Sequence, residues 1–180
     1  MRMNKELITF MTGLVVGAHE SVKQKRKYTN EPYYTHPLRV YEIVQEADRC
    51  TMVMMLAALG HDLIEDTGVT KEIIEELFCK EVADMIDGLS DVSKPEDGNR
   101  SVRKQMDLEH ISKQSADCKT VKLADLIDNT SSILQHDKEF ARVYLREKLL
   151  LLEVLKEGEE GLWNKAYKIA TDGLIELGEM

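Results

Sequence analysis

The sequence has little of what marks several common classes of protein. Its three cysteines, Cys50, Cys79 and Cys118, are odd in number and far apart, so they provide neither a disulfide framework nor a CxxC zinc pair. This usage is typical of a reducing compartment, and we expect a cytoplasmic protein. No run approaches the ~18 apolar residues that a membrane-spanning helix needs. The 24 basic and 33 acidic side chains give a net charge of −9, which disfavours nucleic acid and anionic membranes as partners.

Patterns typical of β-strands are also missing, because no stretch sustains an alternation of apolar and polar residues. The apolar residues between positions 7 and 22 follow the stripe of an amphipathic helix, not the uniform plug of a signal peptide. A length of 180 residues favours one domain, so we predict a single all-α domain over residues 1–180 with about eight or nine helices. After the first helix, the sequence predicts helices near 36–47, 52–59, 70–78, 81–89, 100–115, 118–135, 138–156 and 161–177.

An acidic segment that contains a histidine follows the most apolar run of the chain. Residues 52–59 are hydrophobic on every side, which predicts a buried helix, and they lead into His61, Asp62, Glu65 and Asp66. On a helix, His61 and Glu65 lie one turn apart, and the two aspartates have the same spacing. Burying unpaired carboxylates is costly unless a cation neutralises them. The segment therefore favours a divalent-metal site over a solvated acidic helix end.

One helical turn cannot complete a coordination sphere, so further ligands must come from elsewhere in the chain. The candidates are His36, which stands directly before a proline, and Asp125, which interrupts an apolar helical run. Each has an ordinary alternative, because a histidine before proline often begins a helix and an aspartate in a helix often faces water. These residues alone leave both assignments open. His19, His110 and His136 have no close ligand pair beside them, so we expect a single metal ion.

Four segments, in this order along the chain, together resemble the HD-domain metal-dependent phosphohydrolases. They are the basic pair Arg26-Lys27, the stretch that ends in His36, the HDxxED sequence at 61–66, and the helix that carries Asp125 and Asn129. Within that superfamily they are similar to the hydrolase domain of Rel/SpoT enzymes and to the small alarmone hydrolases. The resemblance covers roughly residues 5–135 and implies an all-α HD-domain helical bundle.

The resemblance implies one Mn²⁺ ion held by His36, His61, Asp62 and Asp125. Imidazole and carboxylate ligands without a thiolate fit this ion, and they leave Fe²⁺ or Zn²⁺ open. It also implies hydrolysis of ppGpp-type alarmones, the nucleotides of the stringent response, into pyrophosphate and GDP or GTP. In such enzymes Glu65 would act as the acid/base and Asp66 as its partner.

The resemblance implies that Arg26, Lys27, Tyr33 and Asn129 bind the substrate, and a second basic group of the sequence adds Arg100 and Arg103 as candidates. The first two belong to the densest basic cluster of the chain and would contact the guanine base, on which the arginine plane can stack. The tyrosine and the asparagine would line the nucleoside pocket. The last two could hold the distal phosphates, and a solvated helix face explains them equally well.

Two departures from the family pattern keep other functions open. The connector at 28–31 lacks the glycine that we expect there, and Asp128 stands where relatives carry histidine or tyrosine. An added negative charge near a polyanionic substrate leaves room for a phosphatase of another phosphorylated nucleotide, such as the 2′-phosphate of NADPH. A third alternative is a non-catalytic metal-binding helical module, against which Glu65 and Asp66 argue. The sequence leaves a homo-oligomer open.

Overall fold

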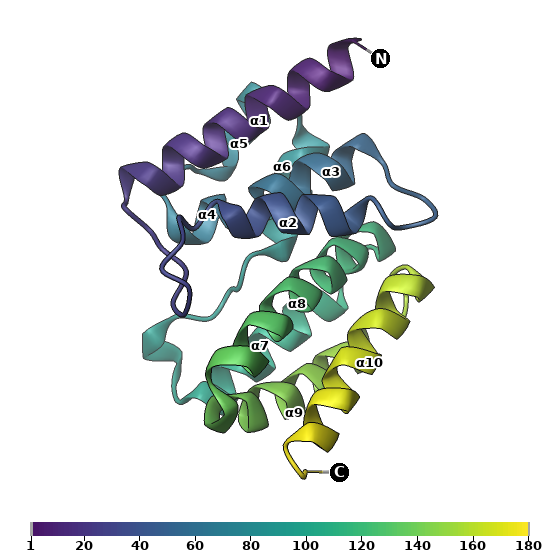
Figure 1. The fold of residues 1–180 in the computed structure, drawn as a ribbon. Helices are drawn as coiled ribbons and strands as arrows, with labels where there is room; N and C mark the ends of the chain where they lie inside the picture. The colour runs from purple at the N-terminus through teal and green to yellow at the C-terminus, as the bar shows by residue number, and fades with distance from the viewer. Residues whose placement is uncertain (1, 180) are drawn as a thin grey trace. The chain divides into compact units, whose positions relative to one another are not determined.

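The computed structural model describes residues 2–179, and they are helical almost throughout (Figure 1). Within this range the chain forms ten α-helices, one 3₁₀ turn and no β-strand, so the predicted all-α fold class is confirmed. The count exceeds the predicted eight or nine because a separate short helix, α4 (Leu63–Asp66), follows a break at 61–62. None of these helices is long and apolar enough to cross a membrane. The chain divides into two compact units, Met1–Ser90 and Asp91–Met180, and a single domain over both stays a prediction.

The first unit is built around its most apolar helix. It contains α1 (Arg2–Ser21), α2 (Thr35–Val44), α3 (Met52–Gly60), α4, α5 (Lys71–Leu77) and α6 (Lys80–Leu89). Helix α3 packs against α1, α2 and α6 because, as predicted, it presents hydrophobic side chains in every direction. Its N-terminus is capped by Thr51, whose hydroxyl accepts a hydrogen bond from the Met54 amide. The last five residues of α3, 56–60, are buried, and the acidic segment begins directly after them.

Helix α1 ends in a Schellman motif formed without glycine. The Gln24 amide donates to the carbonyl of His19 at 3.1 Å, and the Lys23 amide donates to that of Glu20 at 3.0 Å. Lys23 has φ 55°, in the left-handed region that usually favours glycine. This turn reverses the chain and aims the Gln24 side chain back toward α4.

The connector at 22–34 folds into a small hairpin instead of the irregular loop that its polar composition suggests. Lys25 and Pro32 form an antiparallel bridge, and the Arg26 amide donates to the Glu31 carbonyl at 2.9 Å. At the tip, Asn30 has φ 57°. Asparagine tolerates this left-handed conformation better than most residues. Asn30 can therefore adopt the backbone conformation for which we expected a glycine in this connector.

The second unit is a packed group of longer helices. It contains the 3₁₀ turn η1 (Pro95–Asp97) and helices α7 (Arg100–Ser112), α8 (Ala116–His136), α9 (Lys138–Val154) and α10 (Glu160–Glu176). Helices α8, α9 and α10 pack against one another, and α7 packs against α9. A side chain at Gly173 would come within 2.9 Å of Leu134 and 3.1 Å of Leu145, so this glycine allows α10 to approach its neighbours.

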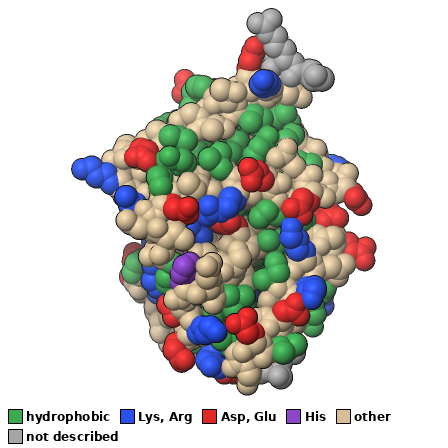
Figure 2. All heavy atoms as spheres, viewed as in Figure 1, with side chains coloured by type: hydrophobic (Ala, Val, Ile, Leu, Met, Phe, Trp, Pro, Cys, Tyr) green, Lys and Arg blue, Asp and Glu red, His purple; other side chains and the backbone are tan. Residues whose placement is uncertain are grey.

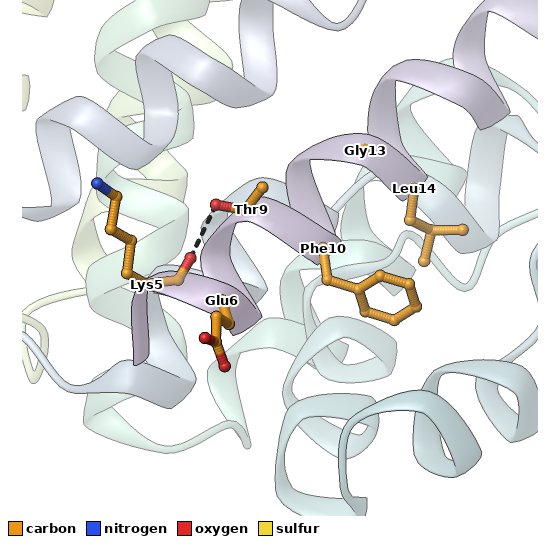
Figure 3. A pocket seen from close by; sticks show the side chains of 6 residues that line it. All are labelled: Lys5, Glu6, Thr9, Phe10, Gly13 and Leu14. Atoms are coloured by element: carbon orange, nitrogen blue, oxygen red, sulfur yellow. Dashed lines mark hydrogen bonds between the residues drawn. The ribbon is translucent and has the colours of Figure 1, made fainter. Parts of the chain in front are cut away.

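The outer face of α1 carries an apolar groove. Hydrophobic side chains gather over the region of α1 in the space-filling view (Figure 2), and Phe10 is 50% exposed. Its ring also contacts that of Phe78, with 5.5 Å between centroids. The groove, shown in Figure 3, is lined by Lys5, Glu6, Thr9, Phe10, Gly13 and Leu14. None of these residues belongs to the predicted site.

Candidate metal centre

The centre is built at the junction between α3 and α4. Helix α3 ends at Gly60, and Asp62 has φ −97° and ψ 0°, outside the helical region. The helical turn on which we placed His61 and Glu65 therefore begins only at Leu63, after a break. A side chain at Gly60 would lie 2.7 Å from the end of Ile86 on α6, so the glycine lets the junction pack closely on the core. The break lets the side chains of the consecutive residues His61 and Asp62 point toward the same place, with Nε2 of His61 3.0 Å from Oδ2 of Asp62.

The orientation of the His61 ring is fixed by the helix that precedes it. Its Nδ1 lies 2.9 Å from the carbonyl oxygen of Ala58. A carbonyl only accepts hydrogen bonds, so Nδ1 must carry the proton and donate it. In the neutral ring, Nε2 then presents a lone pair, which is the form of histidine that binds metal ions. His61 is 3% exposed, so this arrangement is set inside the protein.

Three of the predicted metal ligands meet at this point. The Nε2 atoms of His36 and His61 are 3.2 Å apart, and Oδ2 of Asp62 lies 3.0 Å from Nε2 of His61 and 3.7 Å from that of His36. The ligand atoms all lie within 4.8 Å of one another. His36 is 1% exposed and the Asp62 side chain 14%. Residues from α2 and from the junction are thus brought together although 25 positions separate the two histidines.

The chemistry of these donor atoms fits a divalent cation. Two imidazole nitrogens and a carboxylate oxygen are suitable ligands for Mn²⁺, Fe²⁺ or Zn²⁺. Two buried ring nitrogens facing each other would otherwise leave lone pairs in contact or require a buried proton between them. A cation at the common point satisfies both rings and neutralises the carboxylate. The described residues contain one such group of three, and binding of a single ion stays a prediction.

Tyr33 holds the carboxylate ligand in place. Its hydroxyl donates a hydrogen bond of 2.8 Å to Oδ2 of Asp62, and its ring meets that of His36 edge-on at 5.8 Å. The guanidinium of Arg26 lies over the same ring, 5.8 Å from its centroid. We predicted that Tyr33 lines the nucleoside pocket. That role stays a prediction, and the structure shows a contact with Asp62, a predicted metal ligand, which the sequence pattern did not indicate.

The predicted acid/base pair lies on α4, which begins directly after Asp62. Glu65 and Asp66 are both exposed, so Asp62 is the one of these three carboxylates that is mostly removed from solvent. Oδ2 of Asp66 accepts a hydrogen bond of 2.8 Å from Nε2 of Gln24. Asp62 and Asp66 remain one turn apart, since the Asp66 amide donates to the Asp62 carbonyl at 3.0 Å.

Asp125 and Asn129 belong to the second unit and lie one turn apart on α8. Asp125 is buried, its Oδ1 accepts a hydrogen bond of 2.6 Å from Asn129, and its Oδ2 lies 3.0 Å from Nζ of Lys122. Each carboxylate oxygen of Asp125 thus has a protein donor. The role of Asp125 as the fourth ligand stays a prediction, and the contact of Asn129 indicates that it orients this carboxylate.

The predicted phosphate-binding arginines differ in their surroundings. Arg100 forms two parallel hydrogen bonds with Glu147, at 2.8 and 2.7 Å, and this contact raises the pKa of its guanidinium. The Arg103 Nε is buried and has no hydrogen-bond partner among the described residues. Lys27 lies over the ring of Tyr28, 4.7 Å from its centroid. Of the two arginines, Arg103 therefore has the more available donor.

Lys148 is a half-buried lysine whose surroundings the sequence did not reveal. It lies on α9, with its Nζ 4.5 Å from the centroid of the Tyr144 ring. Desolvation lowers the pKa of Lys148 to about 7, and the positive charge of Lys122 adds to this effect while Asp125 opposes it. A lysine in a run of leucines is typical of an ordinary amphipathic helix. Only the packing of α9 against α8 distinguishes Lys148 from an ordinary surface lysine.

The sequence is similar to an HD-domain family model and to proteins that carry the name of guanosine-bis(diphosphate) hydrolases. A family model described as an HD domain matches residues 15–163. The guanosine-3′,5′-bis(diphosphate) 3′-pyrophosphohydrolase MESH1 of Drosophila melanogaster is 34% identical over 122 residues, which make up 67% of this chain and 66% of that protein. The bifunctional (p)ppGpp synthase/hydrolase SpoT of Escherichia coli is 40% identical over 77 residues, or 43% of this chain and 10% of that protein.

A solved structure shows the same fold. It is described as a metazoan ortholog of SpoT that hydrolyses ppGpp, and it matches with a TM-score of 0.83 over 97% of both chains at 24% identity. The part of this chain that matches the curated relatives spans just under two thirds of the fly protein and about a tenth of the bacterial one. The similarity to SpoT is thus confined to a small part of a much longer protein.

Proposed function

Because this chain belongs to the HD-domain family, we propose that it is a metal-dependent 3′-pyrophosphohydrolase of guanosine 3′,5′-bis(diphosphate)-type nucleotides. The observation that carries the proposal is the cluster of His36, His61 and Asp62, whose ligand atoms lie within 4.8 Å of one another. The relatives named as hydrolases of these nucleotides supply the substrate class. The family model spans residues of both units, which supports one functional domain.

The ligand set of the proposed centre is His36, His61, Asp62 and Asp125. A divalent ion held there supplies Lewis-acid activation of water and neutralises charge on the attacked phosphate. The residues themselves orient the site, since Ala58 fixes the His61 ring and Tyr33 fixes the Asp62 carboxylate. HD domains bind divalent metals, and our specific assignment is Mn²⁺.

The reaction consumes one water and breaks the bond between the ribose 3′-oxygen and phosphorus. Glu65 takes a proton from the attacking water and returns one to the departing 3′-oxygen, with Asp66 as its partner. Pyrophosphate and GDP or GTP are released. The exposure of both carboxylates supports this role, because a group that exchanges protons with solvent between turnovers needs access to it.

Substrate binding is assigned to the basic hairpin and to the second basic group. Arg26 and Lys27 would contact the base, and Tyr33 and Asn129 would line the nucleoside pocket. Arg103 would hold a distal phosphate, supported by its unpartnered Nε. Arg100 would first have to release Glu147 to bind a phosphate, so we expect it to contribute less.

A nucleotide panel tests the proposal. Purified protein with Mn²⁺ is incubated with ppGpp, pppGpp and NADPH, and the products are identified by chromatography and mass spectrometry. We expect pyrophosphate from the two guanosine nucleotides, and loss of this activity in H61A and D62A. H136A is the matched control, because His136 is exposed and lies outside the cluster.

Each other outcome of the panel has a definite meaning. Release of phosphate from NADPH alone would replace the proposed substrate with another phosphorylated nucleotide. Stabilisation by Mn²⁺ in thermal melting without any hydrolysis would make the chain a non-catalytic metal-binding module. Full activity in H61A would eliminate the metal mechanism. A cytoplasmic location and a homo-oligomer remain predictions from the sequence.

A further inference from the structure

A chain of side-chain hydrogen bonds links the end of α1 to the proposed acid/base pair. Nδ1 of His19 lies 2.6 Å from Oε1 of Gln24, and Nε2 of Gln24 lies 2.8 Å from Oδ2 of Asp66. The link spans 47 positions in the sequence, and all its members belong to the first unit. His19 is 1% exposed, whereas Asp66 is exposed to solvent. The link therefore connects a buried histidine to a carboxylate at the surface.

The direction of each hydrogen bond is determined. An ionised Asp66 only accepts hydrogen bonds, so Gln24 must present its amide NH₂ to it. The amide oxygen of Gln24 then faces His19, whose Nδ1 must carry the proton and donate it. These two hydrogen bonds thereby fix which way the Gln24 amide group is turned and which ring nitrogen of His19 carries the proton. A buried group orients Gln24, and Gln24 in turn orients one oxygen of Asp66.

The backbone supports the same geometry. His19 and Gln24 are already joined through the Schellman motif, in which the Gln24 amide donates to the His19 carbonyl. The ring of His19 also packs on that of Tyr33 at 5.0 Å between centroids. The motif by itself explains how α1 ends. It requires neither of the two side-chain hydrogen bonds, and it does not explain why the glutamine amide reaches across to α4.

We propose that His19 and Gln24 are positioning residues, which hold the Asp66 carboxylate in its working orientation beside Glu65. With Oδ2 fixed by Gln24, Oδ1 is left to act with Glu65. The inference rests on the proposed function, since Asp66 needs this orientation only if it takes part in hydrolysis. It gives a functional role to His19, which is not part of the cluster of predicted metal ligands.

The test replaces the donors one at a time. Gln24→Met keeps the length of the side chain and removes both hydrogen bonds. Because a hydrogen bond to a charged group is being lost, we expect kcat for ppGpp to fall roughly tenfold. KM and the Mn²⁺-induced rise in melting temperature should not change. Gln45→Met is the matched control, because the exposed Gln45 amide contacts only the backbone carbonyl of Tyr41.

A double-mutant cycle separates positioning from a structural role. In an Asp66→Ala background, Gln24→Met should have no further effect on the residual kcat, because the carboxylate that it orients is gone. His19→Phe should behave like Gln24→Met. His19→Asn should retain most of the activity, since its amide N–H can take the place of the Nδ1 donor.

The contrary results are distinct. An active wild type with an unchanged kcat in Gln24→Met, or equal losses in both backgrounds, would overturn the inference alone. A His19→Asn variant no better than His19→Phe would overturn it as well. A wild type that hydrolyses no guanosine nucleotide would overturn the proposed function and the inference with it.

Discussion

The hydroxyl of Tyr33 and Oδ2 of Asp62 lie 2.8 Å apart, and this hydrogen bond joins the basic hairpin to the metal centre. The same tyrosine ring lies under Arg26. One side chain thus contacts both a proposed metal ligand and a proposed base-binding residue. In the proposed enzyme, Tyr33 would therefore couple the placement of the nucleotide to the position of the carboxylate ligand.

Replacing Tyr33 with phenylalanine should weaken metal binding while leaving the fold intact. Partners of metal ligands typically change metal affinity or activity by about 10- to 100-fold, and we expect roughly tenfold weaker Mn²⁺ binding in Y33F. Isothermal titration calorimetry measures the change, with Y41F on α2 as the control. Unchanged affinity in Y33F would show that the hydrogen bond does not support the ligand.

The left-handed Lys23 predicts a stabilising substitution. A non-glycine residue in this conformation is strained by about 1 kcal/mol, so Lys23→Gly should raise the free energy of unfolding by a similar amount. Asn30→Gly should give a smaller gain, because asparagine tolerates the conformation better. Urea unfolding of both variants measures the difference. A loss of stability in Lys23→Gly would contradict the strain argument.

The cysteines should differ in their reactivity with iodoacetamide. Cys118 is 2% exposed, and burial raises the pKa of its thiol to about 12. Cys79 is exposed. Since only the thiolate reacts, Cys79 should be labelled first at pH 8, and Cys118 only after unfolding. Mass spectrometry of peptides follows both sites, and comparable labelling rates in the native protein would refute the prediction.

Lys148 should make stability depend on pH in the alkaline range. Its pKa is lowered from 10.5 to about 7 by desolvation, so between these values the unfolded chain binds a proton that the folded chain lacks. The free energy of unfolding should therefore rise with pH from about 7 to 10 by this contribution, and Lys148→Met should remove it. Urea unfolding at pH 7.0 and 9.5 measures the slope.

The control for this prediction is Lys113→Met, which removes an exposed lysine at the end of α7. It should leave the pH dependence as in the wild type. An identical slope in Lys148→Met would mean that Lys148 is protonated in the folded protein at pH 9.5.

Asp107 should be essential for the segment that follows α6. Its Oδ1 accepts hydrogen bonds from the amides of Val92 and Ser93 at 3.2 and 3.0 Å, and its Oδ2 accepts from the Ser93 hydroxyl at 3.1 Å. Asp107→Ala leaves these donors unsatisfied and should cost about 2 kcal/mol. Hydrogen exchange of the two amides should accelerate. Protection equal to the wild type would show that other groups hold the segment.

The helices were predictable because their apolar residues repeat with helical spacing. Helix α10, predicted at 161–177, runs from Glu160 to Glu176, and the all-apolar run at 52–59 is α3. The break at His61 and Asp62 was not predictable, because no glycine or proline stands at the turn itself. The hairpin was not predicted for a similar reason. Lys23 and Asn30 take left-handed conformations, and neither residue type by itself predicts such a conformation.

The site was predictable where a ligand has a distinctive sequence neighbour. His61 and Asp62 follow a buried helix, and His36 was found through its resemblance to a family segment. Tyr33 was assigned to the substrate alone, because hydrogen bonds between distant segments leave no trace in local sequence. The same holds for Gln24 and Asp66, which are 42 positions apart.

The hydrogen bond from His61 to the Ala58 carbonyl has a consequence for how the centre assembles. Because the last turn of α3 already orients the imidazole, folding would place this proposed ligand before any ion enters. Ion uptake then requires little rearrangement of this ligand. A substitution that frays the C-terminal turn of α3 would lower affinity for the ion although every ligand is still present.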